Sequence, residues 1–428
     1  KVMDNRALHN ILIQQRTEID RKLTKHVIDR ELLSKARKSI NSELITVITG
    51  VRRCGKSIFA HQLLQDKKYA YINFDDERLG GLSTEQLNDV FEVLLEIQPN
   101  VHIFLFDEIQ NILRWELFVN RLQRQGYKIV VTGSNANLLS TELSTHLTGR
   151  HLTYNLYPFS FREYVTYTQV HVQKEYTTQT IALYKRALQE YMMTGGVPLA
   201  IQQADVYEYL RALYQDILIT DIALRHQIRQ LNELKELSLY VLMQSSSRIT
   251  YRKLEHVFNL RSAHTIKQYI NYLEEAFLIF QIDSFSFKLK HVIRSPKKIY
   301  TIDHGMIQAL SQQNSQDMGK IMENIVYVEL LRRNQGLIYY YQTKDNKEVD
   351  FVVTHQKTVQ QIIQVCYQLN HHTTKEREVS ALLQASDELS CNTLLVITFD
   401  LDKEEKHGKK TILYIPLWRW LIENKSSY

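Results

Sequence analysis

The first third of the chain alternates short apolar runs with amphipathic segments. Each run is strand-sized and rich in β-branched or aromatic residues, and most of the segments between runs place apolar residues at helical spacing. The runs occupy residues 44–49, 69–74, 101–106, 128–132 and 151–156. Strands that alternate with helices in this way predict an α/β fold, in which helices cover both faces of a parallel sheet.

The pattern changes after the fifth run. Residues 166–245 are mainly helical, with apolar side chains spaced as in a packed core. Between residues 246 and 303, two helical segments precede an apolar strand and a basic hairpin at residues 288–298, an order that predicts a winged helix-turn-helix. Residues 304–428 mix helical and strand patterns and are expected to form a C-terminal α/β domain.

These changes divide the chain into five predicted parts: residues 1–42, 43–165, 166–245, 246–303 and 304–428. A length of 428 residues and an apolar content of 44% suit two or three packed domains. The first part is a helical leader with ten Lys or Arg against five Asp or Glu. Because these charges are spread around any helix wheel, a solvated leader that packs on the next domain is favoured over a nucleic-acid arm.

Composition argues against several classes of protein. Cys54, Cys366 and Cys391 lie far apart without C-x-x-C spacing, which predicts no disulfide framework or zinc site and suits a reducing cytoplasm. The longest apolar runs fall far short of the ~20 residues that span a bilayer, so no membrane partner is expected. The first forty residues are charged throughout, so no signal peptide is expected either. The net charge of +6 is too modest to indicate a partner by itself.

The first apolar run leads into a loop that ends in Gly55, Lys56 and Ser57. The G-x-x-x-x-G-K-S spacing from Gly50, with a strand before it and an amphipathic helix after it, predicts a phosphate-binding P-loop. The glycines permit backbone angles that turn N–H groups towards an anion at the helix N-terminus. Lys56 is expected to reach the β- and γ-phosphates, and the Ser57 hydroxyl to hold Mg²⁺. The predicted nucleotide-binding residues are Gly50, Val51, Arg52, Arg53, Cys54, Gly55, Lys56, Ser57 and Ile58.

Polar residues at the ends of later runs complete a predicted hydrolase site. Asp107 is expected to orient Mg²⁺ through water, and Glu108 to take a proton from the attacking water. Ser134 and Asn135 are candidates for a sensor of the γ-phosphate, although an ordinary helix cap explains Asn135 nearly as well. Arg150 is a candidate to neutralise transition-state charge on the nucleotide of a neighbouring subunit, and a surface arginine is an equal alternative.

With these residues in place, the chain resembles the ASCE-type P-loop ATPases. Within them it is similar to predicted AAA+-like ATPases of bacteria and archaea that carry a C-terminal, diverged restriction-endonuclease-like domain of unknown function. The motifs that carry the resemblance are GVRRCGKS, IFLFDEIQ, VVTGSNANLL, LTGRH, YPFSFREY and MTGGVPLA. The resemblance implies ATP as ligand and Mg²⁺ as cofactor. It also places the turn that ends in Pro198 close to the base of the nucleotide.

The last part of the chain resembles a restriction-endonuclease-like core. In such a core a helix acid, a hairpin aspartate and an (E/Q)-x-K strand gather Mg²⁺ beside a phosphodiester. Glu323, Asp350 and Gln364 match these positions, whereas Cys366 stands where the lysine is expected. The lysine would position the attacking water and stabilise the pentavalent phosphate, and Lys375 is a candidate substitute. Nuclease activity is therefore expected to be weak or lost.

The favoured function is ATP hydrolysis coupled to DNA binding or remodelling. From Arg248 to Lys298 there are ten Lys or Arg against four Asp or Glu, and this concentration favours contact with a phosphate backbone. The alternative that the winged helix serves only for packing within the chain or for protein contact is not excluded by the sequence. Two other functions stay open as well: a nucleotide-gated switch acting through protein partners, and an ATP-regulated DNA nuclease centred on Asp350. Action of Arg150 in trans would require a homo-oligomer.

Overall fold

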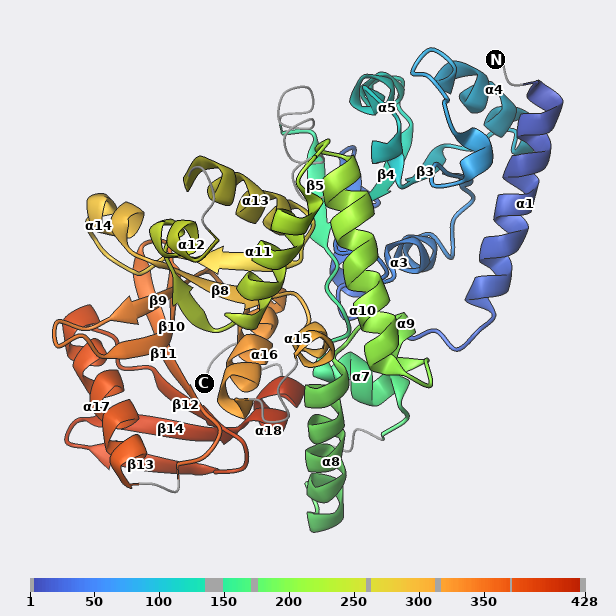
Figure 1. Cartoon of the computed structure of the whole chain (residues 1–428). Helices are drawn as coiled ribbons and strands as arrows, with labels where there is room; N and C mark the ends of the chain where they lie inside the picture. Colours follow the sequence, from blue (N-terminus) through green and yellow to red (C-terminus); the bar gives the residue numbers. More distant parts are fainter. Residues whose placement is uncertain are drawn as a thin grey trace. The chain divides into compact units, whose positions relative to one another are not determined.

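The structure is a computed structural model that describes residues 4–134, 149–170, 176–258, 263–311, 317–369 and 372–423. The chain forms two compact units (Figure 1). One comprises Lys1–Pro158 and Glu275–Phe277, and the other comprises Phe159–Glu274 and Leu278–Tyr428. This division is coarser than the five parts expected from the sequence and does not test their boundaries.

A parallel five-stranded sheet forms the centre of the first unit, as predicted. Its strands are β1 (Ile45–Thr49), β2 (Ala70–Asn73), β3 (Ile103–Asp107), β4 (Lys128–Gly133) and β5 (His151–Asn155). They lie in the order β2-β3-β4-β1-β5, and every pairing is parallel. The carboxyl ends of β1, β3 and β4 therefore meet at one edge of the sheet, where the predicted P-loop and the two acids follow their strands.

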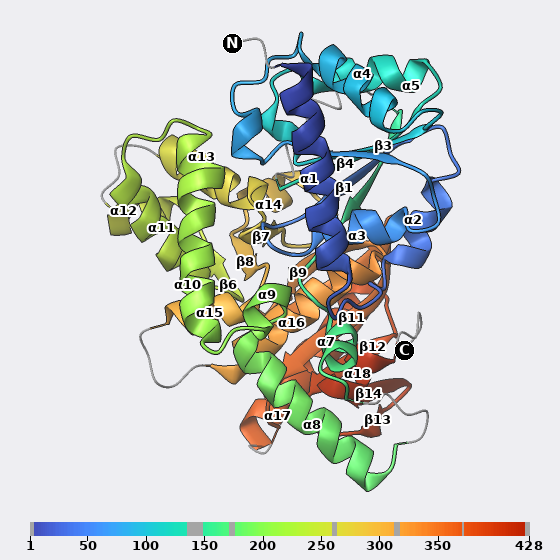
Figure 2. The same cartoon turned by 90° about the vertical axis from the view of Figure 1, so that its right-hand side faces the viewer.

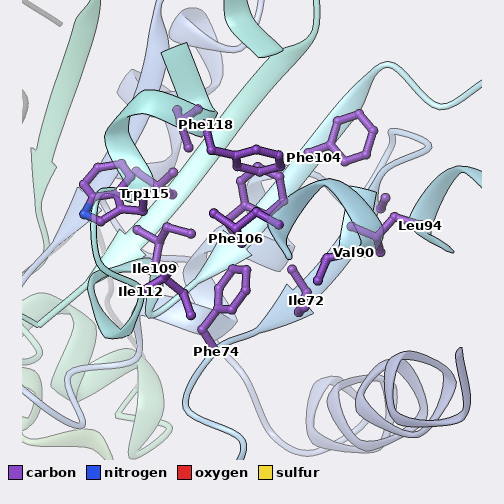
Figure 3. Close-up of a cluster of buried hydrophobic side chains, with 14 of the residues drawn as sticks. Ile72, Phe74, Val90, Leu94, Phe104, Phe106, Ile109, Ile112, Trp115 and Phe118 are labelled. Carbon is purple, nitrogen blue, oxygen red and sulfur yellow. The ribbon is translucent and has the colours of Figure 1, made fainter. Parts of the chain in front are cut away.

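Helices flank this sheet (Figures 1 and 2). They are α1 (Asn5–Leu23), α2 (Leu33–Ser39), α3 (Lys56–Leu63), α4 (Leu87–Ile97) and α5 (Trp115–Arg124), with short 3₁₀ turns η1 (Glu77–Leu79) and η2 (Ile109–Asn111). Figure 3 shows how Phe104 and Phe106 of β3 pack with Val90 of α4 and Phe118 of α5 in a single apolar cluster. Helix α3 packs against β1 and β4, and its buried side chains lie outside this cluster. The α/β fold expected for a P-loop protein is confirmed.

Helix α1 packs on the next domain, as predicted, but its apolar side chains enter the core of that domain, which a solvated leader would not do. Leu8 and Leu12 are only 2% and 3% exposed and join the cluster of Figure 3, together with Ile11. The sequence does not show this burial clearly, because ten basic residues are scattered among the apolar positions of the leader. The leader is therefore an integral element of the first unit.

The second unit begins with helices. Among the described residues these are α7 (Phe161–Tyr167), α8 (Thr178–Thr194), α9 (Pro198–Ile201), α10 (Val206–Asp216), its π-helical continuation η4 (Ile217–Leu224) and α11 (Leu231–Met243). The turn between α8 and α9 needs its glycines. Gly195 has a φ of 77°, and a Cβ there would lie 2.1 Å from the Asp303 carboxylate, which accepts the Gly196 N–H at 2.7 Å. The sharp turn predicted before Pro198 is thus fixed by a buried acid.

A small antiparallel sheet follows. Its strands are β6 (Ser247–Ile249), β7 (Ile279–Ile282) and β8 (Lys297–Thr301), in the order β6-β8-β7. Helices α12 (Tyr251–Phe258) and α13 (Ala263–Glu275) lie between β6 and β7 in the sequence. The basic hairpin predicted at residues 288–298 was wrong, because this segment forms α14 (Leu289–Arg294) before β8 begins. Leu289, Val292 and Ile293 have helical rather than alternating spacing, which accounts for the difference.

A mixed six-stranded sheet completes the second unit. Its strands are β9 (Leu337–Gln342), β10 (Glu348–His355), β11 (Thr358–Cys366), β12 (Leu394–Thr398), β13 (Lys403–His407) and β14 (Lys410–Pro416), in the order β13-β14-β12-β11-β10-β9. The helices of this part are α15 (His304–Leu310), α16 (Met318–Arg333), α17 (His372–Leu389) and α18 (Leu417–Ile422). A C-terminal α/β arrangement is confirmed, and its restriction-endonuclease-like identity stays a prediction. None of the helices among the described residues is long and apolar enough to cross a membrane.

Candidate active site

The loop between β1 and α3 requires glycine at both of its ends. Gly50 has a φ of 153°, and a Cβ on it would lie 2.1 Å from the backbone oxygen of Leu156. Gly55 has a φ of 97° and occupies the left-handed N-cap of α3. Between them Val51 and Cys54 are buried, Arg52 is half-buried and Arg53 is exposed. The loop thus has the backbone form that the motif predicts, with N–H groups at the start of a helix.

Lys56 is buried and turned back into the loop. Its Nζ donates to the backbone oxygens of Gly50 and Val51, each at 3.2 Å, and lies 3.5 Å from Oε1 of Glu108. Two carbonyl oxygens and one carboxylate therefore surround the ammonium group. These are weaker partners than a triphosphate, which presents several charged oxygens to the same group.

The two acids lie close to this lysine. Asp107, the last residue of β3, is buried; the hydroxyl groups of Ser57 and Thr132 both hydrogen-bond its carboxylate. Glu108 has a φ of 51°, and its backbone N–H donates to Thr132 Oγ1 at 3.0 Å. The structure thus brings Lys56, Ser57, Asp107 and Glu108 together.

Burial and charge separate the pKa values of the two acids. Burial, followed by repulsion from Glu108, raises the pKa of Asp107. Burial acts in the same direction on Glu108, but the Lys56 ammonium group and the Gln110 amide outweigh it and hold the pKa of Glu108 below its usual value. Glu108 is therefore the acid that keeps its negative charge and can accept a proton.

Two more polar side chains complete the constellation. Gln110 Nε2 donates to Glu108 Oε2 at 2.6 Å and lies 3.5 Å from Oγ of Ser134, which is buried directly after β4. Ser134 is therefore close to the acids, as expected of a sensor, whereas Asn135 lies outside the described residues. Gln110 was not predicted, although it stands two residues after Glu108 in the quoted motif.

Arg30 is a second residue that the sequence did not reveal. Its guanidinium group is buried and donates to the backbone oxygens of Cys54, at 3.0 Å, and Tyr157, at 2.6 Å. Nearby, Gln62 of α3 donates to the backbone oxygen of Ile28 at 2.9 Å. The leader therefore supports the P-loop directly. No spacing rule marks Arg30, because its partners are backbone atoms far away in the sequence.

Arg150 and Pro198 do not join these residues. The backbone oxygen of Arg150 accepts the N–H of Ile45 at the start of β1. Five residues of β1 separate this point from the P-loop, which at about 3.3 Å per residue is roughly 16 Å. Because of this separation, Arg150 lies too far away to act on a nucleotide held by its own P-loop. Its side chain is exposed. Pro198 is half-buried at the start of α9 in the second unit, where nothing tests its predicted contact with the base.

The three residues predicted for a nuclease centre also come together. Glu323 on α16 and Asp350 on β10 both contact Nζ of Lys298, at 2.7 and 3.1 Å. Gln364 on β11 accepts the backbone N–H of Asp350 at 3.3 Å. The lysine of this cluster is therefore Lys298 on β8. Lys375, the predicted substitute, was the wrong choice, because its Nζ instead pairs with Glu405 at 2.9 Å.

This buried cluster shifts the pKa values of its members. Burial, followed by repulsion from Asp350, raises the pKa of Glu323 to about 8. Burial also raises the pKa of Asp350, against the opposing effect of Lys298. For Lys298, burial favours the neutral amine, but the carboxylates of Glu323, Asp350 and Glu348 outweigh it and raise its pKa. Within the described parts of the chain, no group of three or more His, Cys, Asp or Glu side chains is placed to hold a metal ion.

Comparisons with known proteins agree with the geometry of the first unit. Residues 42–165 match the family described as AAA domain, and residues 185–317 and 318–420 match two domains of unknown function, DUF8612 and DUF4143. The protein named "Uncharacterized protein MJ1544" of Methanocaldococcus jannaschii is 34% identical over 424 residues, which cover 92% of this chain and 94% of that protein. This chain belongs to the same family as MJ1544. A protein of Haemophilus influenzae in turn shares 29% identity over 94% of this MJ1544-family chain and 100% of its own length.

Solved structures similar to this MJ1544-family protein include the Walker-type ATPase PABY2304 of Pyrococcus abyssi. It has a TM-score of 0.43 at 15% identity, over 67% of this chain and 97% of that one. The ORC1 protein of Aeropyrum pernix in complex with DNA has a TM-score of 0.31 at 12% identity, over 68% of this chain and 95% of that one. Scores this low carry no conclusion about function. The AAA match and the P-loop geometry support nucleotide binding and ATPase activity by the first unit.

Proposed function

We propose that the first unit binds ATP with Mg²⁺ and hydrolyses it through Lys56, Ser57, Asp107 and Glu108. The observation that carries this proposal is the meeting of these four side chains at one edge of the parallel sheet. Lys56 leaves its contact with Glu108 when the triphosphate enters, because the phosphate oxygens offer it a stronger charge-assisted interaction. Nucleotide binding thereby releases Glu108 from its ion pair.

The released Glu108 acts as the general base. Loss of the Lys56 contact makes the Glu108 carboxylate a stronger base, and the Gln110 amide still donates to one of its oxygens at 2.6 Å. Ser134 hydrogen-bonds the γ-phosphate or the attacking water, as a polar side chain at the end of β4 is placed to do. Gln110 contacts both Glu108 and Ser134, so we assign it a positioning role. It couples the orientation of the Glu108 carboxylate to that of the Ser134 hydroxyl.

Ser57 and Asp107 fit a magnesium ion. Their hydrogen-bonded oxygen atoms form a hard, oxygen-only donor set, and Mg²⁺ held with a nucleotide needs one or two protein ligands beside phosphates and water. When bound, the ion would neutralise charge on the β- and γ-phosphates. Ser57 would ligate it directly, and Asp107, kept in place by Thr132, would orient its water ligands.

Arg150 is proposed to act in trans. Arg150 is exposed at the amino-terminal edge of the sheet, where its Nη1 donates to Asn120 Oδ1 at 3.3 Å, and its distance from its own P-loop argues against action in cis. A second copy of the chain would have to replace the Asn120 contact. This role requires a homo-oligomer. In an active oligomer, Arg150→Ala should lower turnover without changing nucleotide affinity, whereas unchanged kinetics would reject the role.

Turnover is proposed to act on DNA through residues 246–303. Support comes from the succession β6, α12, α13, β7, α14 and β8 with sheet order β6-β8-β7, which is compatible with a winged helix, and from the local excess of basic residues. The rival function is a nucleotide-gated switch that contacts protein partners through the same surface. Stimulation of the ATPase by DNA distinguishes the two, because the switch predicts none.

The direct test of hydrolysis is Glu108→Gln. This change keeps the shape of the side chain but removes the base, so ATP binding should persist while turnover falls by about a hundredfold or more. Calorimetry with ATP and a phosphate-release assay measure the two quantities. Glu96→Gln, which alters an exposed acid on α4, is the matched control and should behave as wild type. Full activity in Glu108→Gln would remove Glu108 from the mechanism.

The test of DNA binding uses exposed lysines. Lys253 on α12 and Lys267 on α13 are replaced by Ala, and the paired control replaces Lys357 and Lys409, which are also exposed, in the C-terminal sheet region. Fluorescence anisotropy with duplex DNA is measured across a salt series. Each lost phosphate contact should reduce the slope of log affinity against log salt by about 0.9. Identical slopes in both double variants would reject this surface.

A further inference from the structure

Lys298 lies at the centre of a buried cluster of carboxylates. Its Nζ is 2.7 Å from Oε1 of Glu323, 2.7 Å from Oε1 of Glu348 and 3.1 Å from Oδ1 of Asp350. The lysine side chain is 1% exposed, so these three oxygens take the place of its water shell. Lys298 comes from β8 of the small sheet, whereas Glu348 and Asp350 come from β10 of the large one.

These three carboxylates have the chemistry of ligands for a divalent cation, although around Lys298 they are not placed to hold one. Three carboxylates that converge from a helix and a strand offer the oxygen ligands that Mg²⁺ and Mn²⁺ prefer. A divalent ion binds such oxygens at about 2.0–2.1 Å and would have to stand between them, where the Lys298 ammonium group already lies within 3.1 Å of all three. The residues present therefore do not fit a metal ion.

We propose that the Lys298 ammonium group permanently replaces the divalent cation at this centre. The cluster is then a structural ion network, and the second unit carries out no metal-dependent cleavage of nucleic acid. The centre lies in the second unit alone, and its occupation by Lys298 does not depend on ATP hydrolysis by the first unit.

Further contacts of the three acids support this assignment. Asp350 Oδ2 accepts the backbone N–H of Val365 at 2.9 Å, and Glu348 Oε2 pairs with Nε of Arg248 at 3.0 Å. Tyr300 Oη donates to the same Glu323 oxygen that Lys298 contacts, at 2.6 Å. Two basic side chains, one phenol and one backbone amide thus already bind the carboxylates that a metal ion would need.

The network also joins the two sheets of the second unit. Lys298 and Arg248 belong to the small sheet, and their shared partner Glu348 belongs to the large one. Backbone hydrogen bonds run alongside: the N–H of Phe285 donates to Tyr340 O at 2.7 Å, and the N–H of Tyr340 donates to Asp283 O at 3.1 Å. Breaking a buried ion pair leaves charges uncompensated, so the small and large sheets should move as one body.

Mn²⁺ binding to the full-length, nucleotide-free chain tests the proposal. Electron paramagnetic resonance counts bound Mn²⁺ in wild type and in Asp350→Asn, which loses one carboxylate charge but keeps the lysine. The two proteins should bind equally, because the centre takes up no ion in either. An additional Mn²⁺ in wild type that Asp350→Asn fails to bind would overturn the proposal, and this comparison does not depend on any lysine variant.

Lys298→Met provides the complementary measurement. It removes the internal cation with little change in volume, so the variant should gain about one Mn²⁺ per chain and Mn²⁺ should raise its melting temperature. Lys297→Met is the matched control, since Lys297 pairs with Asp283 outside the cluster and should gain nothing. A folded Lys298→Met variant that takes up no additional Mn²⁺ would contradict the proposed replacement.

Discussion

Thr132 serves both acids of the active site through one hydroxyl group. Its Oγ1 donates to the carboxylate of Asp107 and accepts the backbone N–H of Glu108 at 3.0 Å. Glu108 has a left-handed backbone with a φ of 51°, a conformation that a non-glycine residue keeps only when its neighbours hold it. The hydroxyl of Thr132 is one such neighbour, and it links the geometry of the metal-side acid to that of the base.

Thr132→Val should therefore impair hydrolysis more than binding. Valine has nearly the same shape but removes two buried hydrogen bonds, one to the Asp107 carboxylate, which keeps its contact with Ser57, and one from the Glu108 N–H, at a cost of about 1–3 kcal/mol in unfolding free energy. Turnover should fall by at least about tenfold, since Glu108 loses its support. Thr132→Ser restores the hydroxyl and should recover most of the activity. Single-turnover kinetics and urea unfolding measure both effects; wild-type turnover in Thr132→Val would refute the positioning role.

His61 gives the first unit a sensitivity to acid. The side chain is buried on α3, and its Nδ1 lies 2.6 Å from the hydroxyl of Tyr69. Burial, followed by repulsion from Arg16 and Lys22, lowers the pKa of His61 from 6.5 to about 3. The unfolded chain therefore binds the proton more tightly than the folded one between these pH values, so stability is present above pH 6.5 and is lost as the pH falls.

At pH 5 this single group should cost the first unit about 2 kcal/mol relative to neutral pH. His61→Gln keeps a polar side chain opposite Tyr69 but cannot titrate, so its unfolding free energy should decline less between pH 7.5 and pH 5. Chemical unfolding at several pH values makes the comparison. Parallel pH profiles for the two proteins would show that His61 is protonated in the folded state.

The site residues that the sequence predicts stand in recognisable motifs, whereas those that it does not predict act through contacts made only in the folded protein. Lys56, Ser57, Asp107 and Glu108 follow strands at recognisable spacing, and a parallel sheet brings strand ends together by construction. Thr132 and Gln110 act through contacts with side chains and backbone groups that meet only in the folded protein. Lys298 falls in the predicted hairpin, and nothing in the sequence indicates that its side chain contacts acids on β10.

At the scale of elements, α1 is a core helix in a segment whose many charged residues are typical of an exposed one. Leu8, Ile11, Leu12 and Ile19 are buried, and their spacing marks one face of the helix. The basic residues of α1, which are Arg6, Arg16, Arg21 and Lys22, lie outside this buried set, so charge alone does not reveal the apolar face. Burial of the apolar face, together with the contact of Arg30 on the P-loop, makes the leader part of the nucleotide-binding unit.

Leu12→Ala should accordingly cost about 2–5 kcal/mol in the unfolding free energy of the first unit, because it leaves a cavity beside α4. Ile13→Ala is the matched control on the same helix. Ile13 is 46% exposed, so its truncation should change stability by no more than about 0.5 kcal/mol. Equal effects of the two changes, measured by urea unfolding, would mean that α1 does not pack as described.

At the scale of the whole molecule, each unit has a core of its own. The cluster around Phe104 belongs to the first unit, and a separate cluster around Leu382 of α17 belongs to the second. The sequence predicted the parallel sheet of the first unit because its five strands are regular in length and spacing. The second unit was harder, since the three strands of its small sheet are short and one of them, β8, follows a helix where a hairpin was expected.

Separate cores predict separate responses to nucleotide. A ligand that binds only the folded first unit stabilises it by about 2.7 kcal/mol at a hundred times its dissociation constant, so ADP with Mg²⁺ should raise one unfolding transition and leave the other in place. Leu12→Ala and Leu382→Ala identify the transitions, because each removes a buried side chain from one core only. The transition that Leu12→Ala lowers should be the one that nucleotide raises. Lys56→Ala should abolish this shift, and a nucleotide effect confined to the transition marked by Leu382→Ala would contradict the location of the site.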